Sequence, residues 1–84
     1  MADDMTYEVL KVFREDHKDN HNLSRLWIIK WGRAGKPVLE KRRIWIDKEG
    51  NEKPRRATGL TMADIDYIIQ HQDEISDIMK GDVV

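Results

Sequence analysis

The pattern of hydrophobic and polar positions predicts β-strands over residues 7–13, 24–32, 38–47 and 52–58. Residues 7–13 have apolar groups on both sides, and residues 24–32 are rich in Trp and Ile, which favour strands. In 38–47 the alternation places Lys41, Arg43 and Trp45 on one side of an extended strand. Arg42 and Ile44 fall on the opposite side. One side of this strand is therefore cationic and carries an aromatic ring.

A turn is predicted between the third and fourth of these segments, over residues 47–51. Gly50 and Asn51 tolerate the positive φ that tight hairpin turns require. Pro54 follows in the fourth segment and lacks a backbone N–H, so this strand is predicted to lie at a sheet edge or to be bent.

The chain changes to helical spacing over residues 61–80. Thr61 predicts an N-cap, Asp64 complements the positive end of the helix, and Gly81 predicts its termination. The apolar side chains cover an arc of about 200°, wider than the ~100° that packing on one surface needs. We therefore expect part of the helix to cover the sheet and the rest to pack on a second copy of the chain. The alternative is a helix held more deeply by its own sheet. The predicted dimer interface comprises Ile65, Ile68, Ile69, Gln72, Ile75, Ile78 and Met79.

Together these elements predict an α+β fold, a four-stranded antiparallel twisted sheet followed by one C-terminal amphipathic helix that forms a homodimer. The 84 residues suit a single domain. It would comprise a flexible N-terminus over 1–6, a basic sheet over 7–60 and a dimerisation helix over 61–80. The chain has no cysteine, and its longest apolar run is the four residues 26–29, so we expect an intracellular protein without disulfides or a membrane span.

The charge is segregated along the chain, although the net charge is only −1. Residues 1–22 carry three basic and six acidic groups, residues 23–60 eleven and four, and residues 61–84 one and six. The three tryptophans all lie in the basic part. A basic middle between acidic ends predicts a polyanion-binding face, whereas the simpler interpretation is a solvated charged surface.

Tryptophans among basic residues are typical of proteins that bind single-stranded nucleic acid, where rings stack on bases and cations contact phosphates. They are also common in cores. We expect at least one of the three to stack on a ligand and at least one to pack. The candidate nucleic-acid-binding residues are Lys11, Arg25, Trp27, Lys30, Trp31, Arg33, Lys36, Lys41, Arg42, Arg43, Trp45, Lys53, Arg55 and Arg56.

No motif indicates catalysis, a cofactor or a metal. Residues 14–22 form a polar segment, predicted to be a mobile loop, in which His17 and His21 would share a face only if it were helical. Gly35-Lys36 lacks the glycine spacing and the following helix of a phosphate-binding loop. Because the chain shows no nucleophile–base pair, we predict that it is not an enzyme.

Several residues at matched spacing resemble a known family. They are Gly35-Lys36, Arg42, Trp45, Asp47, Glu49-Gly50, Lys53-Pro54, Arg56 and Gly59-Leu60-Thr61, with residues 7–11 and Tyr67. This pattern covers about three quarters of the chain and resembles the C-terminal single-stranded-DNA-binding domain of the positive cofactor four family of transcriptional coactivators.

The resemblance implies a homodimer through the helix, with curved channels that hold single-stranded DNA or unwound duplex. It implies that Arg42 and Trp45 contact the ligand, with Lys11, Lys36, Lys53 and Arg56 as further basic contributors. An extra residue between Arg56 and Gly59 and a longer segment 14–22 depart from the family. No serine-rich regulatory region precedes the domain, as in stand-alone bacterial or phage members. The setting would be transcription, or DNA replication, recombination or repair, in a bacterial nucleoid or a eukaryotic nucleus.

Two classes of function follow. The first is a sequence-tolerant single-stranded DNA-binding protein, with RNA left open because no residue marks a reader of the 2′-hydroxyl. The second is a protein-interaction adaptor that recruits a basic partner through the acidic helix residues Asp66, Asp73, Glu74 and Asp77. An adaptor predicts three buried tryptophans; a nucleic-acid-binding protein predicts that an oligonucleotide quenches the fluorescence of at least one.

Overall fold

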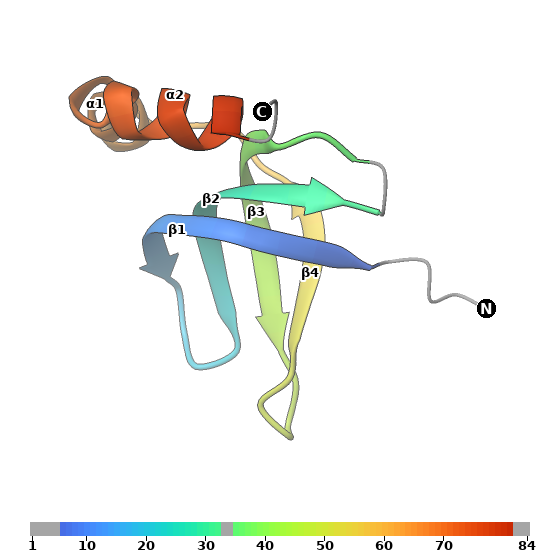
Figure 1. Ribbon diagram of the computed structural model, residues 1–84. Helices are drawn as coiled ribbons and strands as arrows, with labels where there is room; N and C mark the ends of the chain where they lie inside the picture. Colours follow the sequence, from blue (N-terminus) through green and yellow to red (C-terminus); the bar gives the residue numbers. More distant parts are fainter. Residues whose placement is uncertain (1–5, 33–34, 82–84) are drawn as a thin grey trace.

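The computed structural model describes residues 6–32 and 35–81. Its elements are β1 (Tyr7–His17), β2 (Asn22–Trp31), β3 (Val38–Ile46), β4 (Glu52–Ala57), α1 (Met62–Gln70) and α2 (Gln72–Gly81). The strands form one antiparallel sheet in the order β1-β2-β3-β4, so the predicted four-stranded sheet is confirmed. The helices lie at the end of the sheet opposite the β3–β4 turn (Figure 1).

The sheet is strongly curled. β1 and the second half of β2 cross β3 and β4 at a steep angle (Figure 1). β1 carries bulges opposite Ile28 and near Phe13, where its register to β2 shifts, and bulges increase the local bend and twist of a strand. The curl gives the sheet an inner face, which carries Trp27 and Arg42, and a helix-bearing face, which carries Leu26 and Lys41.

β1 is longer than predicted, because it continues through Arg14 to His17. The prediction of a loop from residue 14 was wrong: only residues 18–21 connect β1 to β2. That prediction relied on the absence of apolar residues. In the structure Arg14, Glu15 and Asp16 each bind an oppositely charged side chain from another element, and this pairing substitutes for apolar packing.

The β3–β4 turn agrees with its sequence. Gly50 has φ +85°, in the region where glycine carries no steric penalty. The carboxylate of Asp47 accepts hydrogen bonds from the backbone N–H groups of Asn51 (2.8 Å) and Glu49 (3.0 Å), which lower its pKa. Pro54 lies in β4, an edge strand, and the β3–β4 register shifts next to it, as its missing donor predicts.

The predicted single helix is two helices separated by His71. The N–H of His71 bonds to the carbonyls of both Tyr67 and Ile68, and its φ and ψ of −115° and 23° are not helical. Its ring stacks on Tyr67 at a centroid distance of 4.0 Å. Tyr67 in turn contacts Phe13 of β1, at a ring-centroid distance of 5.9 Å. The break allows α1 and α2 to follow the curved sheet and pack on one apolar cluster.

Two apolar clusters lie on opposite faces of the sheet. The helix-bearing face contributes Phe13, Leu26, Ile28 and Ile75 of α2. Leu23, Trp27, Ile29 and Ile44 form the cluster of the inner face. A sheet of this size therefore supports two small cores, because its curl covers the second without a second layer of helices.

Most of the predicted dimer interface packs within the chain. Ile68, Ile75, Ile78 and Met79 contact the cluster on the helix-bearing face, so the alternative of a helix held by its own sheet applies to these positions. Gln72 is exposed. An exposed stripe remains along α1 and the residue before its cap. It consists of Leu60, Met62, Ile65 and Ile69.

Candidate nucleic-acid interface

Lys41 points from β3 towards the start of α1 and is buried there. Its Nζ lies 2.7 Å from Oδ2 of Asp64 and 3.0 Å from Oδ2 of Asp16. Burial disfavours the charged lysine, but the hydrogen bonds to these carboxylates outweigh it and raise its pKa. Lys41, a candidate binding residue in the sequence, therefore joins the sheet to the helix.

Asp64 is fully buried and is the centre of this join. It accepts hydrogen bonds from Lys41, from Arg14 of β1 at 2.7 Å, and from the backbone N–H and hydroxyl of Thr61 at 2.8 and 3.0 Å. Burial raises the pKa of Asp64, but the bonds from Lys41 and Thr61 outweigh it and lower the pKa. The predicted cap at Thr61 is confirmed, and the carboxylate of Asp64 also holds β1 through Arg14 and β3 through Lys41.

Arg42 points to the inner face, opposite to Lys41. Its Nε lies 2.7 Å from Oε2 of Glu40, and its guanidinium lies 4.8 Å from the ring centroid of Trp31. A further bond joins it to the backbone carbonyl of Arg55. The hydrogen bonds that Arg42 donates to Glu40 raise the pKa of Arg42. Arg42 and Trp45 thus lie on opposite faces, as the alternation indicates.

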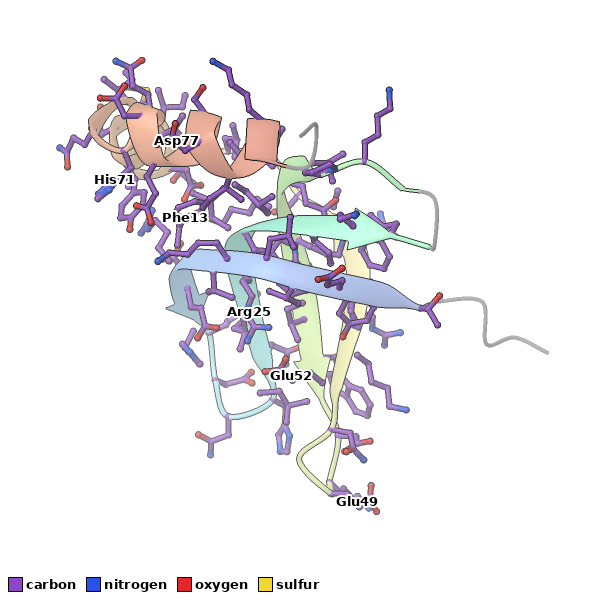
Figure 2. All side chains as sticks on the ribbon, viewed as in Figure 1. Phe13, Arg25, Glu49, Glu52, His71 and Asp77 are labelled. Carbon is purple, nitrogen blue, oxygen red and sulfur yellow. The ribbon has the colours of Figure 1, made fainter. Side chains whose placement is uncertain are left out.

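Arg25 connects both edge strands across the inner face. Its guanidinium binds both carboxylate oxygens of Glu52 in β4, at 2.9 and 2.8 Å, while its Nε lies 2.7 Å from Glu15 in β1. Figure 2 shows Arg25 and Glu52 side by side. The bonds from Arg25 lower the pKa of Glu52. Because this bidentate pair closes the curl, Arg25 has an internal role.

The tryptophans differ in accessibility. Trp27 is 0% exposed, and its Nε1 donates to Glu40 at 3.0 Å. Trp31 is half-buried and packs against Tyr7 at a centroid distance of 5.1 Å. Trp45 is half-buried but lies on the helix-bearing face, beyond the part that the helices cover. Trp27 therefore packs inside the protein, whereas Trp31 on the inner face and Trp45 on the helix-bearing face are both partly accessible.

A groove runs along the uncovered half of the helix-bearing face. The cross-strand pairs Asn22–Trp45 and Ser24–Arg43 form two successive rows along β2 and β3. The main part of the groove has a volume of about 530 Å³ and is lined by Asn22, Arg43, Ile44, Trp45, Pro54, Arg55 and Arg56. An adjoining pocket of about 250 Å³ is lined by Lys18, Asn22, Leu23, Ser24, Arg43 and Thr58. We call the two together the sheet-end groove.

Cations dominate the sheet-end groove. The register shift in β4 places Arg55 and Arg56 opposite Arg43, and the guanidinium of Arg55 lies 5.6 Å from the ring centroid of Trp45. Within residues 6–32 and 35–81, none of these three arginines forms an ion pair with a carboxylate. Lys53 lies opposite Trp45. Its Nζ is 3.9 Å from Oδ2 of Asp47, a distance at the upper limit for an ion pair. The groove therefore has cations available for an anionic ligand.

The remaining candidates lie elsewhere. Lys11 pairs with Glu74 of α2 at 3.2 Å, and Lys30 lies opposite Glu8 of β1. Lys36 is exposed in the β2–β3 connection. Arg33 lies outside the described residues. Lys11, Lys30 and Lys36 do not line either part of the groove.

Sequence reasoning missed the contribution of the β1–β2 connection and of the segment after β4. Lys18 and Asn22 were assigned to a mobile loop, yet both line the groove. Ser24 and Thr58 also line it, although nothing in their immediate sequence marks them. The cross-strand register was the missing information. In the described part of the chain no three side chains are grouped as metal ligands; His21 bonds to the carbonyl of Ile46 at 2.9 Å instead.

No family model, curated protein or solved structure matches this chain. Neither helix in the described ranges has the length and apolar content that spanning a membrane requires.

Proposed function

We propose that this protein binds single-stranded nucleic acid in the sheet-end groove, with little dependence on base sequence. One observation carries the proposal: three arginines without carboxylate partners in the described chain surround the accessible ring of Trp45. Every other Trp or Arg on the described part of the sheet has an internal contact. A groove that leaves its cations unneutralised favours a polyanion as its ligand.

In this proposal Arg43, Arg55, Arg56 and Lys53 neutralise phosphates and release counterions. Trp45 stacks on a base, an interaction worth about 1–3 kcal/mol that any base can make. Arg55 already covers part of the ring, so an incoming base displaces its guanidinium or uses the other face. In both cases Arg55 stays close to the neighbouring phosphate.

The resemblance to the positive cofactor four domain supports the same interface, because its most specific stretch includes Trp45 and Lys53. From that resemblance we take DNA as the preferred ligand over RNA, and transcription or DNA replication, recombination or repair as the setting. The resemblance also favours Arg42 as a ligand contact, whereas the hydrogen bonds of Arg42 to Glu40 favour an internal role for this residue.

We also propose that the protein is a homodimer through α1. Leu60 is 49% exposed, and Met62 and Ile69 are 68% and 60% exposed. Together with Ile65 they form a stripe on the side of α1 that the sheet does not cover, and a second copy would bury it. Analytical ultracentrifugation tests this: Ile65→Asp with Ile69→Asp should give a monomer. A wild-type protein that is already monomeric at high concentration would refute the dimer.

The test of the function is a titration with fluorescein-labelled oligothymidine, oligouridine and a blunt DNA duplex, following anisotropy and tryptophan fluorescence. We expect preferential binding to the single strand, with quenching. In Trp45→Phe the quenching should disappear, because Trp27 is buried and Trp31 packs against Tyr7 and Arg42 on the inner face, while binding is largely retained. Absence of binding at low salt would reject the proposal and turn attention to a basic protein partner of the acidic side chains on α1 and α2.

A further inference from the structure

The β1–β2 connection forms one wall of the smaller pocket and is held in a definite conformation. Lys18 donates its backbone N–H to the carbonyl of Asn22 at 2.9 Å. Asp19 accepts hydrogen bonds from the backbone of His21 and the side chain of Asn22, and these bonds lower its pKa. His21 and Ile46 are joined through their backbones at 2.8 Å. The carboxylate in this connection is therefore occupied by local donors, and the segment is fixed to the end of β3.

The lining of this pocket has the chemistry of an anion site. It is lined by the cationic residues Lys18 and Arg43 and by the hydroxyl-bearing residues Ser24 and Thr58, and no acidic residue lines it. The Thr58 hydroxyl oxygen is buried and has no hydrogen-bond partner in the described chain, although its backbone N–H is held by the carbonyl of Lys41 at 2.9 Å. Cations together with hydroxyl donors are the usual contacts of phosphate oxygens.

The acidic side chain opposite Ser24 on β1 does not neutralise the pocket. Asp16 lies opposite Ser24 on β1, but its carboxylate binds Lys41 at 3.0 Å and Arg14 at 2.9 Å. The charge of Asp16 is therefore balanced by Lys41 and Arg14, the two cations that also bind Asp64 of α1. The positive charge of Lys18 and Arg43 is left for a ligand.

We propose that this pocket is a phosphate subsite that holds one phosphodiester group of a bound single strand, with Lys18 as its outer cation. This inference rests on the proposed function and extends it. The Ser24–Arg43 and Asn22–Trp45 rows are two residues apart, about 7 Å along the strands. A phosphate in one row and a base on Trp45 in the next can therefore belong to one nucleotide. The bound strand runs from Arg55 and Trp45 towards the β1–β2 connection.

Two variants test the subsite. Lys18→Ala should reduce the slope of log affinity for oligothymidine against log salt concentration by about 0.7 in magnitude. The ratio of wild-type to variant affinity should therefore fall about fivefold between 0.05 and 0.5 M salt. Lys48→Ala is the matched control: Lys48 is exposed in the β3–β4 turn and lines neither part of the groove, so the slope should be unchanged.

Thr58→Val removes only the hydroxyl. We expect about tenfold weaker binding with an unchanged salt slope, because a neutral donor to a charged oxygen is lost. The variant should be as stable to urea as wild type or more so, since a buried hydroxyl without a partner is removed. Equal or higher stability with weaker binding would not arise if Thr58 were merely structural.

The outcomes separate the two proposals. If wild type does not bind the oligonucleotide at low salt, the proposed function is wrong and the subsite is rejected with it. If wild type binds and Trp45→Ala weakens binding, but Lys18→Ala and Thr58→Val both behave like Lys48→Ala, the groove binds without this pocket and only the subsite is rejected.

Discussion

Lys41, Arg42 and Arg43 are consecutive in β3, yet they lie in three different environments. Lys41 is buried against Asp64 of α1. Arg42 binds Glu40 and covers Trp31 on the inner face. Arg43 faces the sheet-end groove without a carboxylate in the described chain. The carboxylates that the other strands and the helix bring to a basic residue thus decide whether its charge is used within the fold or left without a carboxylate partner.

Substitutions at the buried and at the exposed cations should also differ in their effect on stability. A buried cation whose partner is removed loses its compensation in a medium of low dielectric constant, which costs several kcal/mol. An exposed arginine that is removed leaves no buried charge, so the fold is hardly affected. Variants of the two groups should therefore divide cleanly between loss of stability and loss of binding.

The largest effect is expected from Asp64→Ala, which leaves Lys41 buried without its closest partner. The free energy of unfolding should fall by about 3–5 kcal/mol, measured by urea denaturation. Asp66→Ala is the control, because Asp66 is an exposed aspartate of the same helix and should change stability by less than about 0.5 kcal/mol. If Asp64→Ala does not fold, Asp64→Asn keeps the shape and tests the charge alone. Equal stability of Asp64→Asn and wild type would contradict the role of this join.

Trp45→Ala should weaken oligothymidine binding by about 1–3 kcal/mol, because the stacking surface is lost. The salt slope should not change, since no phosphate contact is removed. Trp31→Ala provides the contrast: Trp31 packs against Tyr7 and Arg42, so its loss should lower stability. Anisotropy and urea denaturation of both variants measure the difference, and an unchanged affinity of Trp45→Ala would contradict base stacking there.

Arg42→Ala distinguishes two roles of Arg42: an internal contact with Glu40 on the inner face, or the ligand contact that the family resemblance implies. Its hydrogen bonds to Glu40 indicate a stability loss of about 1.5–3 kcal/mol, the range for bonds to charged groups. The salt slope for oligothymidine should stay at the wild-type value. A slope reduced by about 0.7 would show instead that Arg42 contacts a phosphate in the complex.

The double variant Arg43→Ala with Arg56→Ala should show the opposite result. We expect the slope to fall in magnitude by about 1.4, or about 0.7 for each phosphate contact, with binding weakened on every sequence tested. Urea denaturation should show stability close to wild type, because neither guanidinium has an ion pair within the described residues. Loss of stability without a change in the salt slope would mean that Arg43 and Arg56 have an internal role, like the one expected for Arg42, and do not contact phosphates.

The smallest effect is a dependence of stability on acid. The carboxyl groups of Asp64, Glu40 and Glu52 have lowered pKa values in the folded protein, so their contribution to stability is present above their unfolded pKa values, about 4, and is lost as the pH falls further. Urea denaturation between pH 7 and pH 3 should show this fall. The curve should be flatter for Asp64→Asn; identical curves would mean that Asp64 does not contribute.

Short-range patterns were sufficient to predict the main elements. Alternation over 24–32 and 38–47 predicted β2 and β3, Gly50 and Asn51 predicted the turn, and Thr61 with Asp64 predicted the start of α1. Each of these depends on backbone preferences or on bonds between residues a few positions apart. The sequence by itself also determined which side chains alternate together, and so separated Arg42 from Trp45.

Only the tertiary structure decided the use of each charged or apolar side chain. β1 extends through the charged residues 14–17 because other elements supply partners of opposite charge. Asp64, Arg25 and Lys41 form ion pairs with residues 14, 15 and 16 respectively. Ile75 packs on the sheet while Ile69 is exposed, because the break at His71 and the curl of the sheet set which positions face inward. Lys18 joins Thr58 in one pocket although 40 positions separate them. These outcomes depend on contacts between distant segments, which cross-strand register and curvature create and local sequence does not encode.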